Sequence, residues 1–159
     1  MKITNLSVSL IPAAVLLAVA SIASLPAARA DDDVKMVTIV ANDSLKFSVK
    51  EIDATPGQKI HVQMTNEGTL PKDGMGHNWI LLDSEAEAGP YASTALSARS
   101  TEYEPKALAS HVLASIPLLG PKETGEVTFC APMKPGKYPY ICSCSGHSMA
   151  GMKGYLIVK

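Results

Sequence analysis

Residues 138–154 read Tyr-Pro-Tyr-Ile-Cys-Ser-Cys-Ser-Gly-His-Ser-Met-Ala-Gly-Met-Lys-Gly. Within this stretch, Cys142, His147 and Met152 offer a thiolate, an imidazole and a thioether in one short loop. These three donors together suit a soft or borderline metal ion. The stretch therefore contains most of a copper site.

The residues on either side of this loop favour β-strands. Tyr138, Tyr140 and Cys142 recur at every second position, which places them on one face of a strand and directs the cysteine sulfur inward. A closing strand is expected over residues 154–159, Gly-Tyr-Leu-Ile-Val-Lys. The loop between the two strands should lie at one end of the fold, and any further ligand must reach that end.

One strong ligand is missing from the loop, because a trigonal copper centre with a long axial thioether needs two imidazoles and one thiolate. His77 is the candidate for the second imidazole. It lies in Gly-Met-Gly-His-Asn-Trp (74–79), after a turn rich in proline and glycine and before the apolar run of residues 79–82.

Two separated motifs resemble one known family. The segment Leu70-Pro71-Lys72-x-x-Met75-Gly76-His77-Asn78-Trp79 resembles the first-histidine segment of azurins. The loop pattern Cys-x4-His-x4-Met is similar to the spacing in auracyanin and rusticyanin, which is one residue longer before the methionine than in azurin. The chain is identified by this resemblance as a member of the azurin-like cupredoxins, densely over residues 58–83 and 119–159 and weakly between them.

The resemblance implies an all-β fold, a Greek-key β-sandwich with a short helical flap between strands. It also implies one copper ion per chain, alternating between Cu(I) and Cu(II), with a weak axial contact from the Gly76 carbonyl. The implied ligands are His77, Cys142, His147 and Met152. By the same resemblance, Asn78 should tie the His77 loop to the end of the cysteine strand, next to Ser143.

The rest of the chain agrees with a sandwich that carries one helical insertion. Short strands are expected over residues 36–40, 60–65 and 125–130, separated by turns at 56–57 and 132–136. Residues 84–110 have a helix-compatible composition and no strand alternation, in the interval where azurins carry a helical flap. His61 and His111 are expected to have structural or surface roles, since the sequence places no carboxylate or nucleophile beside His111.

The three cysteines leave one alternative open. Cys144 has the plastocyanin spacing to His147 and Met152 and is a rival thiolate, although the strand register favours Cys142. If Cys130 pairs near residues 138–140, Cys144 lies on the order of 13 Å further along, too far for a disulfide. Cys130 should then be a strand thiol, and Cys144 a loop thiol near copper that is open to oxidation.

Other metal sites fit the spacing less well. The Cys-x-Cys pair lacks the three-residue gap expected of the binuclear copper loop in oxidase subunits. A structural zinc finger would have paired Cys-x2-Cys spacing.

Residues 1–30 have the pattern of a secretory signal. Lys2 precedes an apolar run over residues 10–25, and Ala28-Arg29-Ala30 is a small-x-small cleavage site. A membrane anchor is the alternative, but the run is short for a span. We therefore expect cleavage before Asp31, which leaves one domain, 31–159, with 12 basic and 15 acidic residues. This mildly acidic balance gives no basic patch for nucleic acid.

These features predict a periplasmic type 1 blue-copper electron carrier, a monomer without a membrane span in the mature chain. Its expected partners are redox proteins such as c-type cytochromes or a terminal reductase or oxidase. Because protein ligands fill every strong position, no site remains for a substrate and the protein is not expected to be an enzyme. A nitrite-reductase-like domain would also need histidines from a second domain.

Two questions stay open at this point. The seven methionines keep a second function possible, a periplasmic protein that stores or delivers copper. Four residues near the loop could form an apolar docking patch around His147 or simply pack within their loops: Leu70, Met75, Met149 and Ala150.

Overall fold

The computed structural model describes residues 34–159. The expected signal sequence, residues 1–30, and the start of the expected domain at residue 31 lie outside the described residues. Among the described residues, no helix has the length and apolar character needed to cross a membrane.

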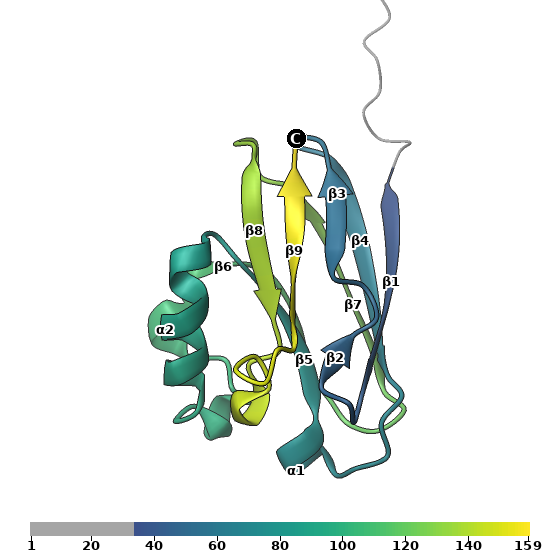
Figure 1. Cartoon of the computed structure of the whole chain (residues 1–159), viewed down its shortest axis with the longest axis vertical. Helices are drawn as coiled ribbons and strands as arrows, with labels where there is room; N and C mark the ends of the chain where they lie inside the picture. Colours follow the sequence, from purple (N-terminus) through teal and green to yellow (C-terminus); the bar gives the residue numbers. More distant parts are fainter. Residues whose placement is uncertain (1–33) are drawn as a thin grey trace, which may run out of the picture.

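Over residues 34–159, nine strands form two sheets that pack face to face, so the predicted β-sandwich is confirmed (Figure 1). The first sheet has the order β2-β1-β4-β7, with bounds Lys46–Phe47, Lys35–Asn42, Lys59–Asn66 and Thr124–Cys130. The second has the order β3-β9-β8-β5-β6, with bounds Glu51–Ala54, Lys153–Val158, Gly136–Ile141, His77–Leu82 and Val112–Leu119. Two pairs, β1 with β4 and β3 with β9, are parallel, and the other pairs are antiparallel.

The predicted helical flap is present between β5 and β6. It consists of α2 (Glu85–Ala95) and the 3-10 helices η1 (Arg99–Thr101) and η2 (Lys106–His111). The part of the chain that the structure describes has two further short helices outside the flap: α1 (Lys72–Met75), within the turn rich in proline and glycine, and η3 (Cys144–Gly146).

The position of β5 in the core explains why residues 79–82, just before the flap, are all apolar. All six residues of β5 are buried, because its inner face meets the first sheet and its outer face is covered by α2. Trp79 on the inner face is 0% exposed, and its ring lies 5.3 Å from that of Tyr140 and 6.0 Å from that of Phe129. Trp79 therefore has a packing role between the two sheets.

The pairing of β7 differs from the expectation. Cys130 was expected to pair near residues 138–140, but it pairs with Lys59 of β4, so β7 and β8 belong to different sheets. The chain changes sheets in the turn at 132–136, a switch that strand alternation does not reveal. All three cysteines of the described residues are free, and Cys130 is the exposed one.

Strand directions bring the sequence motifs to one end of the sandwich. β5 runs antiparallel to β8, with Ile80 opposite Ile141, so the start of β5 lies beside the end of β8. The loop that joins β8 to β9 lies at this end, and its helix η3 contacts α1 (Figure 1). We call this end, which includes α1, His77 and residues 142–152, the metal pole.

Candidate metal centre

Three side chains from two distant segments meet at the metal pole. The Nδ1 atom of His77 lies 3.9 Å from Sγ of Cys142, and that of His147 lies 3.5 Å from the same sulfur. The possible ligand atoms of the three residues all lie within 4.8 Å of one another, and all three side chains are buried. This is the one such group of His, Cys, Asp and Glu side chains that residues 34–159 contain.

Each donor is placed by its element. Cys142 follows β8, and its inward direction continues the buried faces of Tyr138 and Tyr140, as predicted. His77 is the first residue of β5, directly after α1. His147 ends the turn that contains η3, where its amide donates to the Cys144 carbonyl at 2.8 Å.

The remaining two candidates lie beside this group. Met152 is 0% exposed; its amide donates to the His147 carbonyl at 3.0 Å, and its carbonyl accepts from the Cys142 amide at 3.1 Å. Gly76 is buried and precedes His77. A Cβ atom at Gly76 would lie 2.6 Å from the Lys72 carbonyl oxygen, so this close approach needs glycine.

Burial sets the protonation of the donors. It lowers the pKa of His77 to about 4, with a further contribution from neighbouring His147. Burial also lowers the pKa of His147 and raises the pKa of Cys142 to about 12. The backbone amides of Asn78 and Cys144 oppose the shift at Cys142, because they donate towards its sulfur. Neutral imidazoles therefore face a thiol that requires a nearby cation to ionise.

Asn78 joins the two ligand segments, as the sequence predicted. Its Oδ1 accepts from the Ser143 amide at 2.8 Å, and its Nδ2 donates to Ser143 Oγ at 2.9 Å. All four of these atoms are buried. Residues next to His77 and Cys142 are thus held together independently of any ligand at the site.

The position of Cys144 corrects one expectation. Its side chain is 0% exposed and packs in the main core cluster, so it is not an accessible, oxidisable loop thiol. Its sulfur does not belong to the group formed by Cys142 and the two histidines in the described residues. The geometry favours Cys142 over the rival thiolate.

The other two histidines lie outside the metal pole. His61 is half-buried on β4, with Nδ1 at 2.8 Å from Thr128 Oγ1. His111 has two carboxylate neighbours in the fold: its Nδ1 is 3.1 Å from Asp83 Oδ2 and its Nε2 is 3.8 Å from Glu87 Oε2. These partners come from the end of β5 and from α2, which adjacency in sequence could not reveal.

Sequence reasoning missed one contact of the site, the turn at Glu102–Tyr103. The backbone carbonyl of Tyr103 accepts a hydrogen bond from Ser143 Oγ at 2.7 Å. The phenol hydroxyl of Tyr103 accepts a hydrogen bond from Ser145 Oγ at 3.0 Å. The turn lies in the interval where the family resemblance is weak, so no motif pointed to it.

The donor set fits the copper expected from the sequence. A thiolate with two imidazole nitrogens suits a copper ion, and burial of a thiol with a pKa of about 12 favours a site completed by a cation. The three donors come from two separate segments and are all buried, so the surrounding protein keeps water from them.

Comparisons with known proteins agree with this geometry. Residues 34–159 match the family of copper-binding proteins described as the plastocyanin/azurin family. The azurin of Achromobacter denitrificans is 35% identical over 146 residues, which cover 90% of this chain and 95% of that protein.

Solved structures give the same result. Dithionite-reduced auracyanin from Roseiflexus castenholzii superposes with a TM-score of 0.70 at 28% identity, covering 79% of this chain and 97% of that one. Auracyanin A from Chloroflexus aurantiacus, described as a blue copper protein, has a TM-score of 0.68 at 35% identity, covering 78% and 98%. The expected azurin-like resemblance is confirmed.

Proposed function

The chain belongs to the plastocyanin/azurin family of copper-binding proteins, and we propose that it carries single electrons between redox partners through one type 1 copper ion. The observation that carries this proposal is the convergence of one thiol and two imidazoles within 4.8 Å. We propose that His77, Cys142 and His147 would hold the ion as strong ligands, and that Met152 and the Gly76 carbonyl would be its weak contacts.

The protein's part in the proposed mechanism is to hold these donors in one geometry. Bound copper supplies a one-electron couple between Cu(I) and Cu(II). The hydrogen bonds of Asn78 to Ser143 fix the two ligand segments, so little rearrangement accompanies a change of charge. The amides of Asn78 and Cys144, which donate towards the Cys142 sulfur, stabilise its thiolate form.

The burial of the site supports a carrier over an enzyme. His77, Cys142 and Met152 are 0% exposed, and His147 is 4% exposed. A substrate could not reach a ligand position between these groups, whereas an electron needs only a short path. His147 reaches solvent by a narrow edge of its side chain, and we propose this edge as the route for the electron.

An apolar surface around His147 supports docking to a partner. Met149 is 62% exposed and Leu70 is 44% exposed, while Met75 is partly buried and Ala150 is exposed. Leu96, at the end of α2, is 47% exposed and approaches Gly146 as Met149 does. We propose that redox proteins such as c-type cytochromes or a terminal reductase or oxidase dock here as transient partners.

We also propose that the protein is a periplasmic monomer whose mature domain is 31–159. The pattern over residues 1–30 supports export. In an exported carrier, redox partners would bind transiently to the exposed apolar surface at the metal pole.

Copper retention tests the carrier against the copper-delivery alternative. The copper-loaded protein is reduced with ascorbate and reoxidised over several cycles in the presence of a Cu(I) chelator. We expect the absorption of the oxidised protein to return undiminished, because buried ligands release copper slowly. Transfer of copper to the chelator in the first reduced interval would support delivery instead.

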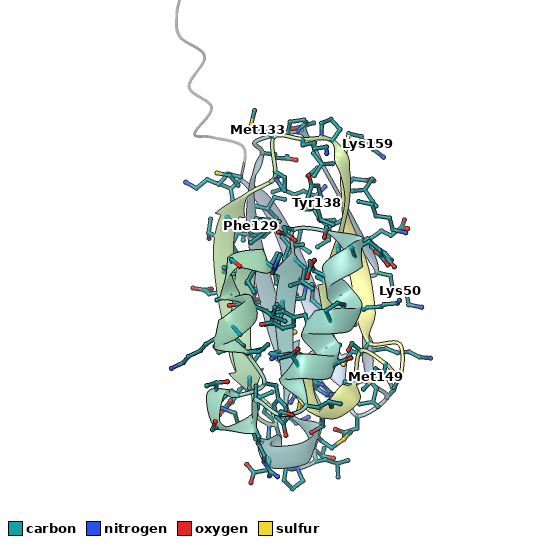
Figure 2. All side chains as sticks on the ribbon, turned by 90° about the vertical axis from the view of Figure 1, so that its left-hand side faces the viewer. Lys50, Phe129, Met133, Tyr138, Met149 and Lys159 are labelled. Carbon is teal, nitrogen blue, oxygen red and sulfur yellow. The ribbon has the colours of Figure 1, made fainter. Side chains whose placement is uncertain are left out.

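The docking surface is tested by electron self-exchange between copies of the protein. Met149→Glu places a charge beside His147, and Met133→Glu places the same charge at the opposite end (Figure 2). Met149→Glu should slow self-exchange by about tenfold at low salt, because like charges meet at the contact, while Met133→Glu changes it little. Equal effects of the two substitutions would argue against docking at His147.

A further inference from the structure

The turn between η1 and η2 contains two adjacent residues in a conformation that side chains disfavour. Glu102 has φ 53° and Tyr103 has φ 64°, in the left-handed region. Neither is glycine or asparagine, so the surrounding contacts must hold the turn in place. Within the flap, the Glu102 amide donates to the Arg99 carbonyl and the Tyr103 amide to the Ala98 carbonyl, at 3.1 and 2.9 Å.

The same turn contacts the Cys142–His147 loop at two points. Ser143 Oγ donates to the Tyr103 carbonyl at 2.7 Å. Ser145 Oγ donates to the Tyr103 hydroxyl at 3.0 Å. Ser145 itself has φ 42°, so two disfavoured turns face each other and are joined by a hydrogen bond.

The turn also contacts the segment that carries His77. The Tyr103 hydroxyl donates to the Asp73 carbonyl of α1 at 3.2 Å. The Glu102 carboxylate forms an ion pair with Lys72 at 2.9 Å. The backbone carbonyl of Glu102 accepts a hydrogen bond from Asn78 Nδ2 at 3.4 Å. One phenol hydroxyl therefore links α1, before His77, to Ser145, before His147.

We propose that Tyr103 is a positioning residue of the copper centre, which holds the His77 segment and the Cys142–His147 loop at a fixed separation. Neither segment is paired to the other by a β-ladder, because β5 and β8 pair only at Ile80 with Ile141 and Leu81 with Tyr140. Beyond that ladder, the alignment of the two segments depends on side chains. Asn78 and Ser143 link them near Cys142, and Tyr103 links them near His147.

The chain offers a matched control for removing this hydroxyl. Tyr138 is also largely buried, and its hydroxyl donates to a backbone carbonyl, that of Lys134, at 2.7 Å. Figure 2 shows Tyr138 towards the end of the sandwich opposite Met149, away from the metal pole. Tyr103→Phe and Tyr138→Phe therefore each remove one partly buried phenol hydroxyl, but only the hydroxyl of Tyr103 contacts ligand segments.

The test compares copper release and spectra of the two variants. Tyr103→Phe should accelerate transfer of Cu(II) to a chelator by about tenfold, the factor that about 1.4 kcal/mol represents, and should shift the thiolate-to-copper absorption band. Tyr138→Phe should leave the band in place and the rate within about twofold of the wild type, because its site is distant. Tyr103→Phe removes two hydrogen bonds and Tyr138→Phe removes one, so the unfolding free energies of the metal-free variants are measured as well. A purely structural role of Tyr103 would lower stability without shifting the absorption band.

A second substitution, at Ser145, removes the group that donates a hydrogen bond to the Tyr103 hydroxyl. Ser145→Ala should accelerate release in the same direction as Tyr103→Phe, and the double variant should release copper no faster than the faster single variant. Additive effects, or equal effects of Tyr103→Phe and Tyr138→Phe, would overturn the inference.

The inference rests on the proposed copper centre, and the two can fail separately. A wild-type protein without a thiolate-to-copper band would contradict the proposed function, and the inference with it. A blue wild-type protein whose Tyr103→Phe variant behaves as Tyr138→Phe does would contradict the inference alone.

Discussion

Asn78 has two roles at the metal pole, since its backbone amide faces the Cys142 sulfur and its side chain bonds Ser143. The side-chain bonds connect buried polar atoms, which are costly to leave without partners. The residue beside the first histidine thus stabilises the fold as well as the site.

Replacement of Asn78 by alanine should lower the free energy of unfolding of the metal-free protein by about 2 kcal/mol, because the buried Ser143 amide loses its acceptor. Asn42→Ala is the control, since Asn42 is exposed and its side chain bonds only to Ser44 in its own turn. Denaturant unfolding measures both. A loss for Asn78→Ala no larger than that for Asn42→Ala would contradict this role.

The carboxylate of Asp43 should make the stability of the fold depend on pH. Its Oδ2 accepts from the Thr69 amide at 2.9 Å and from the Thr69 hydroxyl at 3.1 Å, and the amide contact is the main cause that lowers the pKa of Asp43 below 3.8. A carboxylate with a lowered pKa in the folded state stabilises the protein above its unfolded pKa, and this contribution is lost as pH falls through the folded value.

Asp43→Asn should therefore lower the melting temperature at neutral pH, and the difference from the wild type should shrink as the pH falls below 3.8. Thermal unfolding of the metal-free protein between neutral and acidic pH measures this difference. A difference that stays constant over the whole range would show that the charge of Asp43 is not involved.

At the element scale, α1 determines how closely the chain approaches His77. Gly74 lies within α1, and Gly76 caps its end, where its amide donates to the Lys72 carbonyl at 2.9 Å. A Cβ atom at Gly76 would come within 2.6 Å of that carbonyl oxygen and 3.0 Å of Leu118 Cγ, whereas a Cβ atom at Gly74 would meet nothing within 4 Å.

Gly76→Ala should thus lower the free energy of unfolding by about 1–3 kcal/mol, because backbone must shift to admit the methyl group. Gly74→Ala should be neutral or stabilising by up to about 1 kcal/mol, because alanine favours the helix and has space. Urea unfolding of the two metal-free variants measures both effects. Equal values would contradict the close packing of α1 against the start of β5.

The sequence predicted elements well where a local pattern carried them. Alternation every two residues indicated β4 and the inward direction of Cys142, and the continuous apolar run of β5 belongs to a strand that α2 covers from outside. The pairing of Cys130 near residues 138–140 that the sequence suggested was wrong, because alternation gives the face of a residue and not its partner strand.

At the candidate site, too, the residues in local motifs could be predicted and the tertiary contacts could not. His77 and the loop from Cys142 to Met152 are linked to motifs, and the Asn78 contact followed from the resemblance. The contacts of Tyr103 could not be predicted, because they depend on two left-handed residues in a flap that carries no recognisable motif. The carboxylates beside His111 and the full burial of Cys144 likewise arise from tertiary packing.

For the whole molecule, the three cysteine thiols differ in how far the fold exposes them to solvent. Cys130 is exposed at the end of β7, while Cys142 and Cys144 are 0% exposed at the metal pole. Thiol accessibility in the native protein therefore reports whether the sandwich and the metal pole are intact.

A thiol reagent should label the native metal-free protein at one cysteine rapidly and at all three after denaturation. Cys130→Ser should remove the rapid phase and leave the slow one. The kinetics of labelling, followed by mass spectrometry, measure this. Rapid labelling of Cys144 in the native protein would contradict its burial in the core.

The assignment of the thiolate ligand is the central claim for the molecule as a whole, and the most direct test is an absorption and electron paramagnetic resonance spectrum after addition of Cu(II). The wild-type protein and its Cys144→Ser variant should both show an intense blue band and narrow copper hyperfine splitting. Cys142→Ser should lose both features. Loss of the blue band in Cys144→Ser but not in Cys142→Ser would contradict the account and assign the ligand to Cys144.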